Sequence, residues 1–269
     1  MRKIRKFIFF KLKIIFLNLV KFLLDKQYYN LLPNLSKNYL SNLYWSTNTK
    51  TFFLKDSHQA INIFRIDSTN FKSDLCNIAE KYNTDKSPYN EKGTRHSYTA
   101  FYDFLFQSLK NESFNFAEIG IYQNGSIQMF RKYFPNATIY GFDFNEQLLN
   151  KAKMDKLEKT YYFKIDSSNK KNIFENFKNI EKKFKIIIDD STHIFEHQFN
   201  IIESTYNFLE PGGILIIEDI SFFKNFEISY KNKLGHLINF FSKIYFVEAN
   251  HINKYTLANN DRLLVLIKK

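Results

Sequence analysis

The sequence predicts an α/β fold, with a mostly parallel sheet of seven strands that ends in an antiparallel hairpin. From Ser113 onward, apolar segments suited to strands alternate with segments of helical spacing. Two further strand-like segments, 243–250 and 261–269, follow each other with only polar residues between them. Parallel strands need a crossover connection, usually a helix, whereas consecutive strands with a short connection can pair antiparallel. The alternating part therefore predicts a parallel sheet with helices on both faces.

The individual elements follow from local patterns along residues 74–269. Apolar residues recur at helical spacing in LCNIAEKY and in YTAFYDFLFQSL, on either side of the polar loop 83–96. The later helices are expected near 125–133, 146–159, 171–182 and 197–209. The strands are expected at 114–121, 137–144, 160–166, 184–190 and 212–220, before the final hairpin.

Composition limits the class of protein. A chain of 269 residues with 44% apolar and 18% aromatic residues can bury one main core. Cys76 is the sole cysteine, so an intramolecular disulfide and a cysteine-rich zinc site are excluded, and a cytoplasmic setting is expected. The net charge of +12 suits nucleic acid, an anionic membrane surface or an anionic substrate, and does not choose among them.

The segment before the α/β domain divides into two parts. Residues 1–26 are basic and apolar, but lysines interrupt the apolar run, which is too short to cross a bilayer. We interpret them as a basic amphipathic helix that lies at the inner face of the cytoplasmic membrane or, equally, packs on the protein's own core. Residues 27–73 are expected to be a small accessory region, and residues 74–269 the main domain.

Acidic residues follow one predicted strand after another. In an open parallel sheet, ligands bind beyond the carboxyl ends of the strands. A single acid there can be a helix cap or a solvated loop residue, but a series of five strand ends predicts a binding site. The acids are Glu118, Asp143, Asp166, Asp189, Asp190, Glu218 and Asp219.

The first strand leads into EIGIYQNGS, which bears on the cofactor. Tyr122 stands where a dinucleotide-binding loop would need a glycine, and no phosphate-loop motif is present. Asp143 at the next strand end can accept hydrogen bonds from ribose hydroxyls, Asp166 from an adenine amino group, and Glu118 can bind an ammonium. These roles together predict S-adenosylmethionine as the cofactor.

Several motifs together resemble a known family. Residues 81–269 are similar to the S-adenosylmethionine-dependent O-methyltransferases of macrolide deoxysugars, those of mycinamicin and tylosin. The resemblance lies in YNTDKS, in His96, Tyr98 and Tyr102, in AEIGIYQNGSIQMFRKYFPNATIYGFDF, in IIIDDSTH, in LEPGGILIIED and in NDRLLVLIKK. It implies a Rossmann-like class I methyltransferase fold, a divalent metal and an alcohol acceptor.

The resemblance also implies roles for particular residues. Asp190 and Asp219 match metal-binding positions, with Glu218 as a further metal ligand, and crowded carboxylates without cysteine favour Mg²⁺. His193 matches the catalytic base, and we count Asp190 with it as catalytic. His197 is expected to be a residue of the helix face. The expected cofactor-binding residues are Glu118, Gly120, Tyr122, Asp143, Asp166, Asp189 and Tyr98. Asp85, Lys86, His96 and Tyr102 are expected to cover the cofactor or admit the acceptor.

The predicted function is transfer of a methyl group to a hydroxyl of a sugar or saccharide precursor, in surface polysaccharide biosynthesis such as that of a capsule. Two alternatives stay open: methylation of a phosphate or phosphoramidate group on a capsular precursor, and a non-catalytic basic protein that binds membranes. Nucleic acid is not expected as a partner, because the lysines are dispersed and no stacking or zinc module is evident. The sequence leaves a homo-oligomer open.

Overall fold

The computed structural model describes residues 44–46, 52–53, 60–91, 93–222, 224–256 and 260–269. The predicted membrane helix 1–26 and most of the accessory region before Ala60 lie outside the described residues. Residues 41–269 belong to one compact unit. Within the described residues, no helix combines the length and the apolar character that a membrane span needs.

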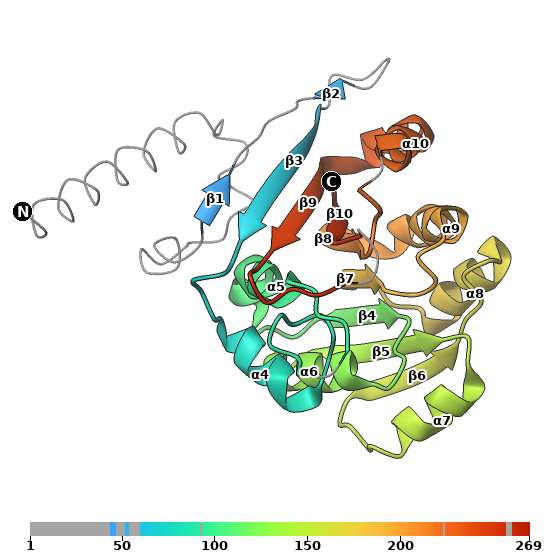
Figure 1. Cartoon of the computed structure of the whole chain (residues 1–269). Helices are drawn as coiled ribbons and strands as arrows, with labels where there is room; N and C mark the ends of the chain where they lie inside the picture. The colour runs from blue at the N-terminus through green and yellow to red at the C-terminus, as the bar shows by residue number, and fades with distance from the viewer. Residues whose placement is uncertain (1–43, 47–51, 54–59, 92, 223, 257–259) are drawn as a thin grey trace, which may run out of the picture. The chain divides into compact units, whose positions relative to one another are not determined.

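Helices and strands alternate as the sequence predicts (Figure 1). The α-helices are α4 Asp74–Tyr82, α5 Tyr98–Phe106, α6 Gly125–Tyr133, α7 Glu146–Lys153, α8 Lys170–Ile180, α9 Phe195–Thr205 and α10 Lys224–Leu234. The strands are β1 Tyr44–Ser46, β2 Phe52–Phe53, β3 Ala60–Asp67, β4 Asn115–Ile119, β5 Thr138–Asp143, β6 Thr160–Lys164, β7 Phe184–Asp189, β8 Leu209–Ile217, β9 Phe241–Asn250 and β10 Arg262–Lys268. Helix α10 was not predicted from the sequence.

The sheet has the order β1-β3-β9-β10-β8-β7-β4-β5-β6. The five strands from β6 to β8 run parallel, and β10 pairs antiparallel with both β8 and β9. The prediction of a parallel sheet that closes with an antiparallel hairpin is therefore confirmed for β4 to β10. Because β4, β7 and β8 are neighbours, the residues that follow them meet at one edge.

The sheet extends beyond the seven predicted strands. Strand β3 pairs in parallel with β9, Ile63 opposite Phe246, and β1 and β2 pair antiparallel with β3. The pattern AINIFRI was assigned to the accessory region, but here it continues the main sheet. Ile61 and Ile63 are buried in the same apolar core as Phe246, and this burial supports the added strand.

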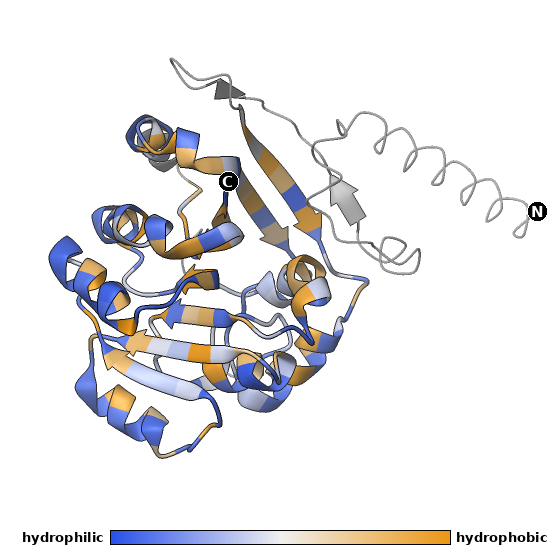
Figure 2. Cartoon of the chain, turned by 180° about the vertical axis from the view of Figure 1, so that it is seen from behind, coloured by the Kyte–Doolittle hydropathy of each residue, from blue (hydrophilic) through white to orange (hydrophobic). Residues whose placement is uncertain are grey.

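Helices cover both faces of the sheet. Figure 2 shows apolar residues along the central strands and polar residues over the outer helices. On one face, Phe116 of β4 packs against Phe130 of α6 with ring centroids 4.6 Å apart. On the other face, Phe142 of β5 stacks on Phe177 of α8 at 5.1 Å. Strands buried on both faces need apolar residues at successive positions, which is the pattern of IIID in β7.

Candidate functional site

The carboxyl ends of β4, β7 and β8 are joined by backbone hydrogen bonds. The Asp190 N–H donates to the Ile119 carbonyl at 2.8 Å, and the Glu218 N–H donates to the Asp189 carbonyl at 2.9 Å. These bonds continue the ladder one residue past the strands. They bring acids that are far apart in the sequence to one edge of the sheet, as the sequence predicts.

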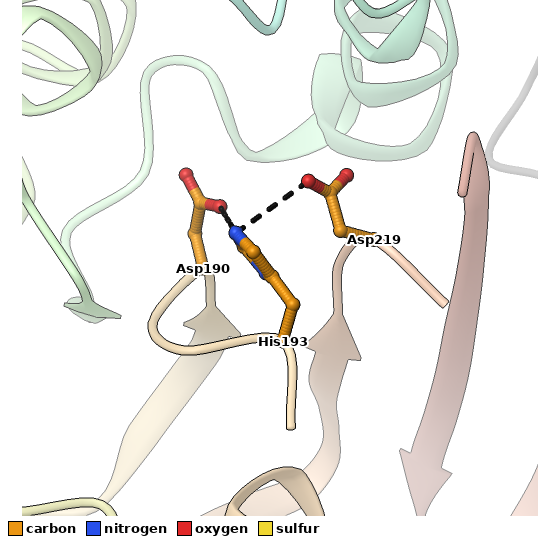
Figure 3. A group of neighbouring side chains, drawn as sticks. All are labelled: Asp190, His193 and Asp219. Carbon is orange, nitrogen blue, oxygen red and sulfur yellow. Dashed lines mark ion pairs between the residues drawn. The ribbon is translucent and has the colours of Figure 1, made fainter. Parts of the chain in front are cut away.

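Asp190, His193 and Asp219 form a first group, which we call the open group (Figure 3). The Nε2 atom of His193 lies 4.0 Å from Oδ1 of Asp190 and 3.6 Å from Oδ2 of Asp219. Both distances exceed the roughly 3.2 Å of a good hydrogen bond, so the three side chains face a common space. The His193 side chain is 38% exposed, and a ligand can therefore reach this space from solvent.

The backbone at the open group adopts conformations that side chains usually avoid. His193 has φ of 57° and Asp219 has φ of 58°, both in the left-handed region. Each such residue costs on the order of 1 kcal/mol or more, and residues of this kind concentrate at functional sites. Gly120 has φ of 91°, and a Cβ atom there would lie 2.1 Å from the carbonyl oxygen of Asp190. Glycine at position 120 thus lets the Asp190 backbone approach the end of β4.

Two aromatic side chains hold Asp219. The Tyr98 hydroxyl donates to Oδ1 of Asp219 at 2.6 Å, and Nδ1 of His96 lies 3.5 Å from the same oxygen. The His96 and Tyr98 rings stack with centroids 4.9 Å apart, and His96 Nδ1 also lies 2.7 Å from Oδ1 of Asp261. Burial raises the pKa of Asp219. The predicted cofactor-binding residue Tyr98 therefore acts on Asp219 in this arrangement.

Glu118, Asp190 and Glu218 form a second group, the closed group, around the ammonium of Lys86. Nζ of Lys86 lies 2.5 Å from Asp190 Oδ2, 2.7 Å from Glu218 Oε2 and 3.2 Å from Glu118 Oε1. Lys86, Glu118 and Glu218 are almost completely buried. The second oxygen of Glu218 accepts a hydrogen bond of 2.6 Å from the Tyr102 hydroxyl, and that of Glu118 accepts one of 2.8 Å from Ser126.

Burial and charge act in opposite directions on the closed group. Burial raises the pKa of Glu118 to about 7 and that of Glu218 well above its usual value, although the Lys86 charge lowers both. Burial lowers the pKa of Lys86, but the charges of Asp190, Glu218 and Glu118 outweigh it and leave that pKa well above its usual value. One ammonium thus stabilises three crowded carboxylates.

The remaining predicted residues lie along the neighbouring strand ends. Asp143 accepts hydrogen bonds through Oδ2 from the N–H groups of Ile121 at 3.1 Å and Tyr122 at 3.2 Å, while the Tyr122 side chain is 69% exposed. Asp166 accepts from the N–H and the hydroxyl of Ser168. These contacts hold the loops, and the predicted ribose and adenine contacts of Asp143 and Asp166 stay predictions.

Asp189 and Glu118 are less accessible than their predicted cofactor roles require. The Asp189 side chain is buried and accepts from Ser191 through Oδ1, and burial raises its pKa to about 6. Glu118, predicted to bind an ammonium of the cofactor, lies instead beside the ammonium of Lys86. Both roles stay predictions, and the arrangement speaks against them because neither carboxylate faces solvent.

The sequence interpretation missed the contacts that Lys86 and Tyr102 make. Both residues stood in motifs that were quoted, YNTDKS and the histidine-tyrosine motif, but nothing in those motifs indicated which carboxylate each would contact. His197, expected on a helix face, lies on α9 with Nδ1 3.0 Å from the Thr192 hydroxyl.

The fold and the site define the class of protein: a Rossmann-like α/β domain with acids at the carboxyl edge of its parallel strands. Residues 124–258 match the methyltransferase domain family, which is half of the chain. The chain belongs to this family, and the prediction of a methyltransferase is confirmed.

Two relatives agree with the resemblance drawn from the motifs. Mycinamicin VI 2''-O-methyltransferase of Micromonospora griseorubida is 30% identical over 93 residues, 32% of this chain and 21% of the relative. The structure of the MycE methyltransferase from the mycinamycin biosynthetic pathway, in complex with Mg, SAH and mycinamycin VI, superposes with a TM-score of 0.55 at 22% identity. The match covers 74% of this chain and 55% of that chain. A second MycE structure, with Mg and SAH, gives a TM-score of 0.54 at 21% identity, covering 73% of this chain and 55% of that chain.

The extent of these matches limits what they show. The chain spans about a fifth of the curated relative and about half of the MycE chain. At this identity, the structural likeness shows the fold, which is that of a class I methyltransferase.

Proposed function

We propose that this protein transfers a methyl group from S-adenosylmethionine to a hydroxyl of a saccharide, with a divalent cation at the open group and His193 as the base. The observation that carries the proposal is the geometry of Asp190, His193 and Asp219, whose ligand atoms lie within 4.8 Å of one another around a solvent-accessible space. Two carboxylates and an imidazole there can bind a cation, an alcohol and the proton of that alcohol.

The cofactor is proposed to bind at the loop between β4 and α6. The loop contains Gly120 and Tyr122, and Asp143 lies against its backbone. Asp143 keeps a carboxylate at the end of β5, the strand next to β4, where ribose hydroxyls can donate to it. The membership in the methyltransferase family supports this cofactor, and so does MycE, whose structures are described with SAH.

The donor atoms of the open group fit a hard divalent cation. Carboxylate oxygens are the ligands that Mg²⁺ prefers, and the open group contains no sulfur ligand. Asp190 and Asp219 would hold the ion, with Glu218 as a further predicted ligand. A bound Mg²⁺ lowers the pKa of a coordinated hydroxyl.

His193 is proposed to take the proton of the acceptor hydroxyl. Its Nε2 atom faces the space between Asp190 and Asp219 without a hydrogen bond to either, so it can accept a proton from an alcohol bound there. Asp219, held by Tyr98, and Asp190, held by Lys86, keep the two sides of this space in position. The oxygen then attacks the methyl group of the sulfonium, and sulfur leaves with the electron pair of the broken bond.

The acceptor is proposed to be a sugar of a surface polysaccharide precursor. Mycinamicin VI 2''-O-methyltransferase, by its name, methylates a hydroxyl, and this supports an alcohol acceptor. The net charge of +12 suits a precursor that carries phosphate, or the anionic inner face of the cytoplasmic membrane. Contact of residues 1–26 with that membrane belongs to this proposal.

Methyl transfer with labelled S-adenosylmethionine tests the proposal. The full chain is incubated with the cofactor and an extract of polysaccharide precursors, with Mg²⁺ or with a chelator. Label is expected in a saccharide with Mg²⁺, and its loss with the chelator should be reversed by added Mg²⁺. Full activity in the chelator would remove the metal from the mechanism, and label in protein or lipid alone would contradict the saccharide.

A further inference from the structure

Lys86 reaches from the loop between α4 and α5 to the ends of three strands. Its side chain is 1% exposed and contacts Glu118 after β4 begins to turn, Asp190 after β7 and Glu218 after β8. The Lys86 carbonyl accepts hydrogen bonds from the N–H groups of Tyr98 at 3.0 Å and Thr99 at 3.2 Å, at the start of α5. The position of the ammonium is thus set by a helix and not by a mobile tail.

The three carboxylates around Lys86 have the geometry of a cation site. One oxygen from each of Glu118, Asp190 and Glu218 lies within 4.8 Å of the other two, as in the open group. Two such groups share Asp190 and therefore lie side by side. A divalent cation would meet two positions there if the ammonium were absent.

Asp190 divides its oxygens between the two groups. Oδ2 bonds to Lys86 at 2.5 Å, whereas Oδ1 points toward His193 at 4.0 Å. An oxygen bound to the buried ammonium cannot rotate into the open group without leaving that charge unpaired. The contact with Lys86 therefore determines which oxygen of Asp190 remains for a ligand.

We propose that Lys86 is a positioning residue that fills one of two adjacent cation positions, so that a divalent ion enters only the open group and meets Oδ1 of Asp190. The proposal rests on the proposed function in one respect, namely that the open group binds a divalent ion. Lys86 itself contacts neither the methyl donor nor the acceptor in this role.

Counting bound Mn²⁺ tests the proposal. The full chain and its Lys86→Met variant are titrated with Mn²⁺, and free Mn²⁺ is measured by electron paramagnetic resonance. The wild type is expected to bind one ion and Lys86→Met to bind two, because the three carboxylates lose their internal cation. The matched control is Lys171→Met, which removes a lysine from an exposed pair with Glu175 on α8 and should keep the wild-type count.

The criterion is the difference between the two counts. One additional ion in Lys86→Met supports the proposal, and an equal count overturns it. This difference is independent of the proposed function: a wild type that binds no ion would refute the metal at the open group, and the variant would still be expected to gain one. A merely structural lysine would change stability without changing the number of ions.

A second variant covers the case in which Lys86→Met does not fold. The double variant Lys86→Met with Glu118→Gln has the same net charge in the closed group as the wild type, because one cation and one anion are both removed. Its amide oxygen can still act as a ligand for a divalent ion. One ion more than the wild type supports the proposal, and an equal count overturns it.

Discussion

The open and the closed group use the same kinds of side chain, share Asp190, and differ in burial and in internal partners. In the closed group, Glu118 and Glu218 are buried, and each has one oxygen near Lys86 and the other bonded to a hydroxyl. In the open group, the His193 side chain is 38% exposed and its Nε2 lies beyond hydrogen-bond distance of both carboxylates. A carboxylate cluster is thus available to a ligand only where the protein has not already satisfied it.

The comparison separates two tasks at one sheet edge. The closed group neutralises buried charge, because unpaired ions in an apolar interior would cost several kcal/mol each. The open group keeps its charges toward solvent, where a cation and an alcohol can compete for them. Changes in the open group should therefore affect catalysis, and changes in the closed group should affect stability.

The largest expected effect is that of His193→Ala on turnover. Loss of the base should lower turnover by roughly 10²- to 10⁴-fold. The affinity for S-adenosylmethionine should change little, because His193 lies on the acceptor side of the proposed site. Steady-state kinetics and calorimetric titration measure the two quantities. His197→Ala, one helical turn further along, is the matched control and should keep wild-type turnover. Equal losses in the two variants would contradict the role of His193.

The second effect is the dependence of stability on pH, tested with Glu118→Gln. The carboxyl of Glu118 has a usual pKa of 4.5, and burial raises it to about 7 in the folded protein. Between these values the folded state retains a proton that the unfolded state has released, so the free energy of unfolding falls as pH rises. The slope from this one group is at most about 1.4 kcal/mol per pH unit, and it vanishes above pH 7.

Urea unfolding at several pH values measures this slope. Glu118→Gln should show a shallower decline than the wild type between pH 4.5 and 7. Other carboxyls, such as Asp189, titrate in the same range in both proteins, so only the difference between the two slopes is informative. Identical slopes would mean that Glu118 does not hold a proton in the folded state.

The smallest effect distinguishes the two groups by paired tyrosines. Tyr98 donates to Asp219 in the open group, and Tyr102 donates to Glu218 in the closed group, each at 2.6 Å. Tyr98→Phe should lower Mn²⁺ affinity by roughly 10- to 100-fold, as the loss of a partner of a metal ligand does. Tyr102→Phe should lower the free energy of unfolding by about 1–3 kcal/mol, because Glu218 keeps an unpaired oxygen.

Each tyrosine variant serves as the control of the other. Calorimetric titration with Mn²⁺ and urea unfolding are measured on both. A loss of Mn²⁺ affinity in Tyr102→Phe equal to that in Tyr98→Phe would assign Glu218 to the metal ligands, as the sequence predicts, and would make the two groups one site.

Much of the domain from β4 to β10 could be predicted because its signals are local. Alternation of apolar strands with amphipathic helices implies a parallel sheet, and the order of the chain then places the acids at one edge. Segments such as AINIFRI were harder to assign, because whether a short apolar strand joins the main sheet depends on a partner far along the chain. Ile63 pairs with Phe246, and no local pattern encodes that register.

The sequence by itself determined the class of fold, the edge of the sheet at which a ligand binds, and the residue types available there. Only the tertiary structure decided how Asp190 divides its two oxygens, and that Lys86 and Tyr102 enclose Glu218. The physical reason is that strand and helix patterns arise from neighbours in the chain. Burial and charge pairing arise between residues such as Lys86 and Glu218, which are 132 positions apart.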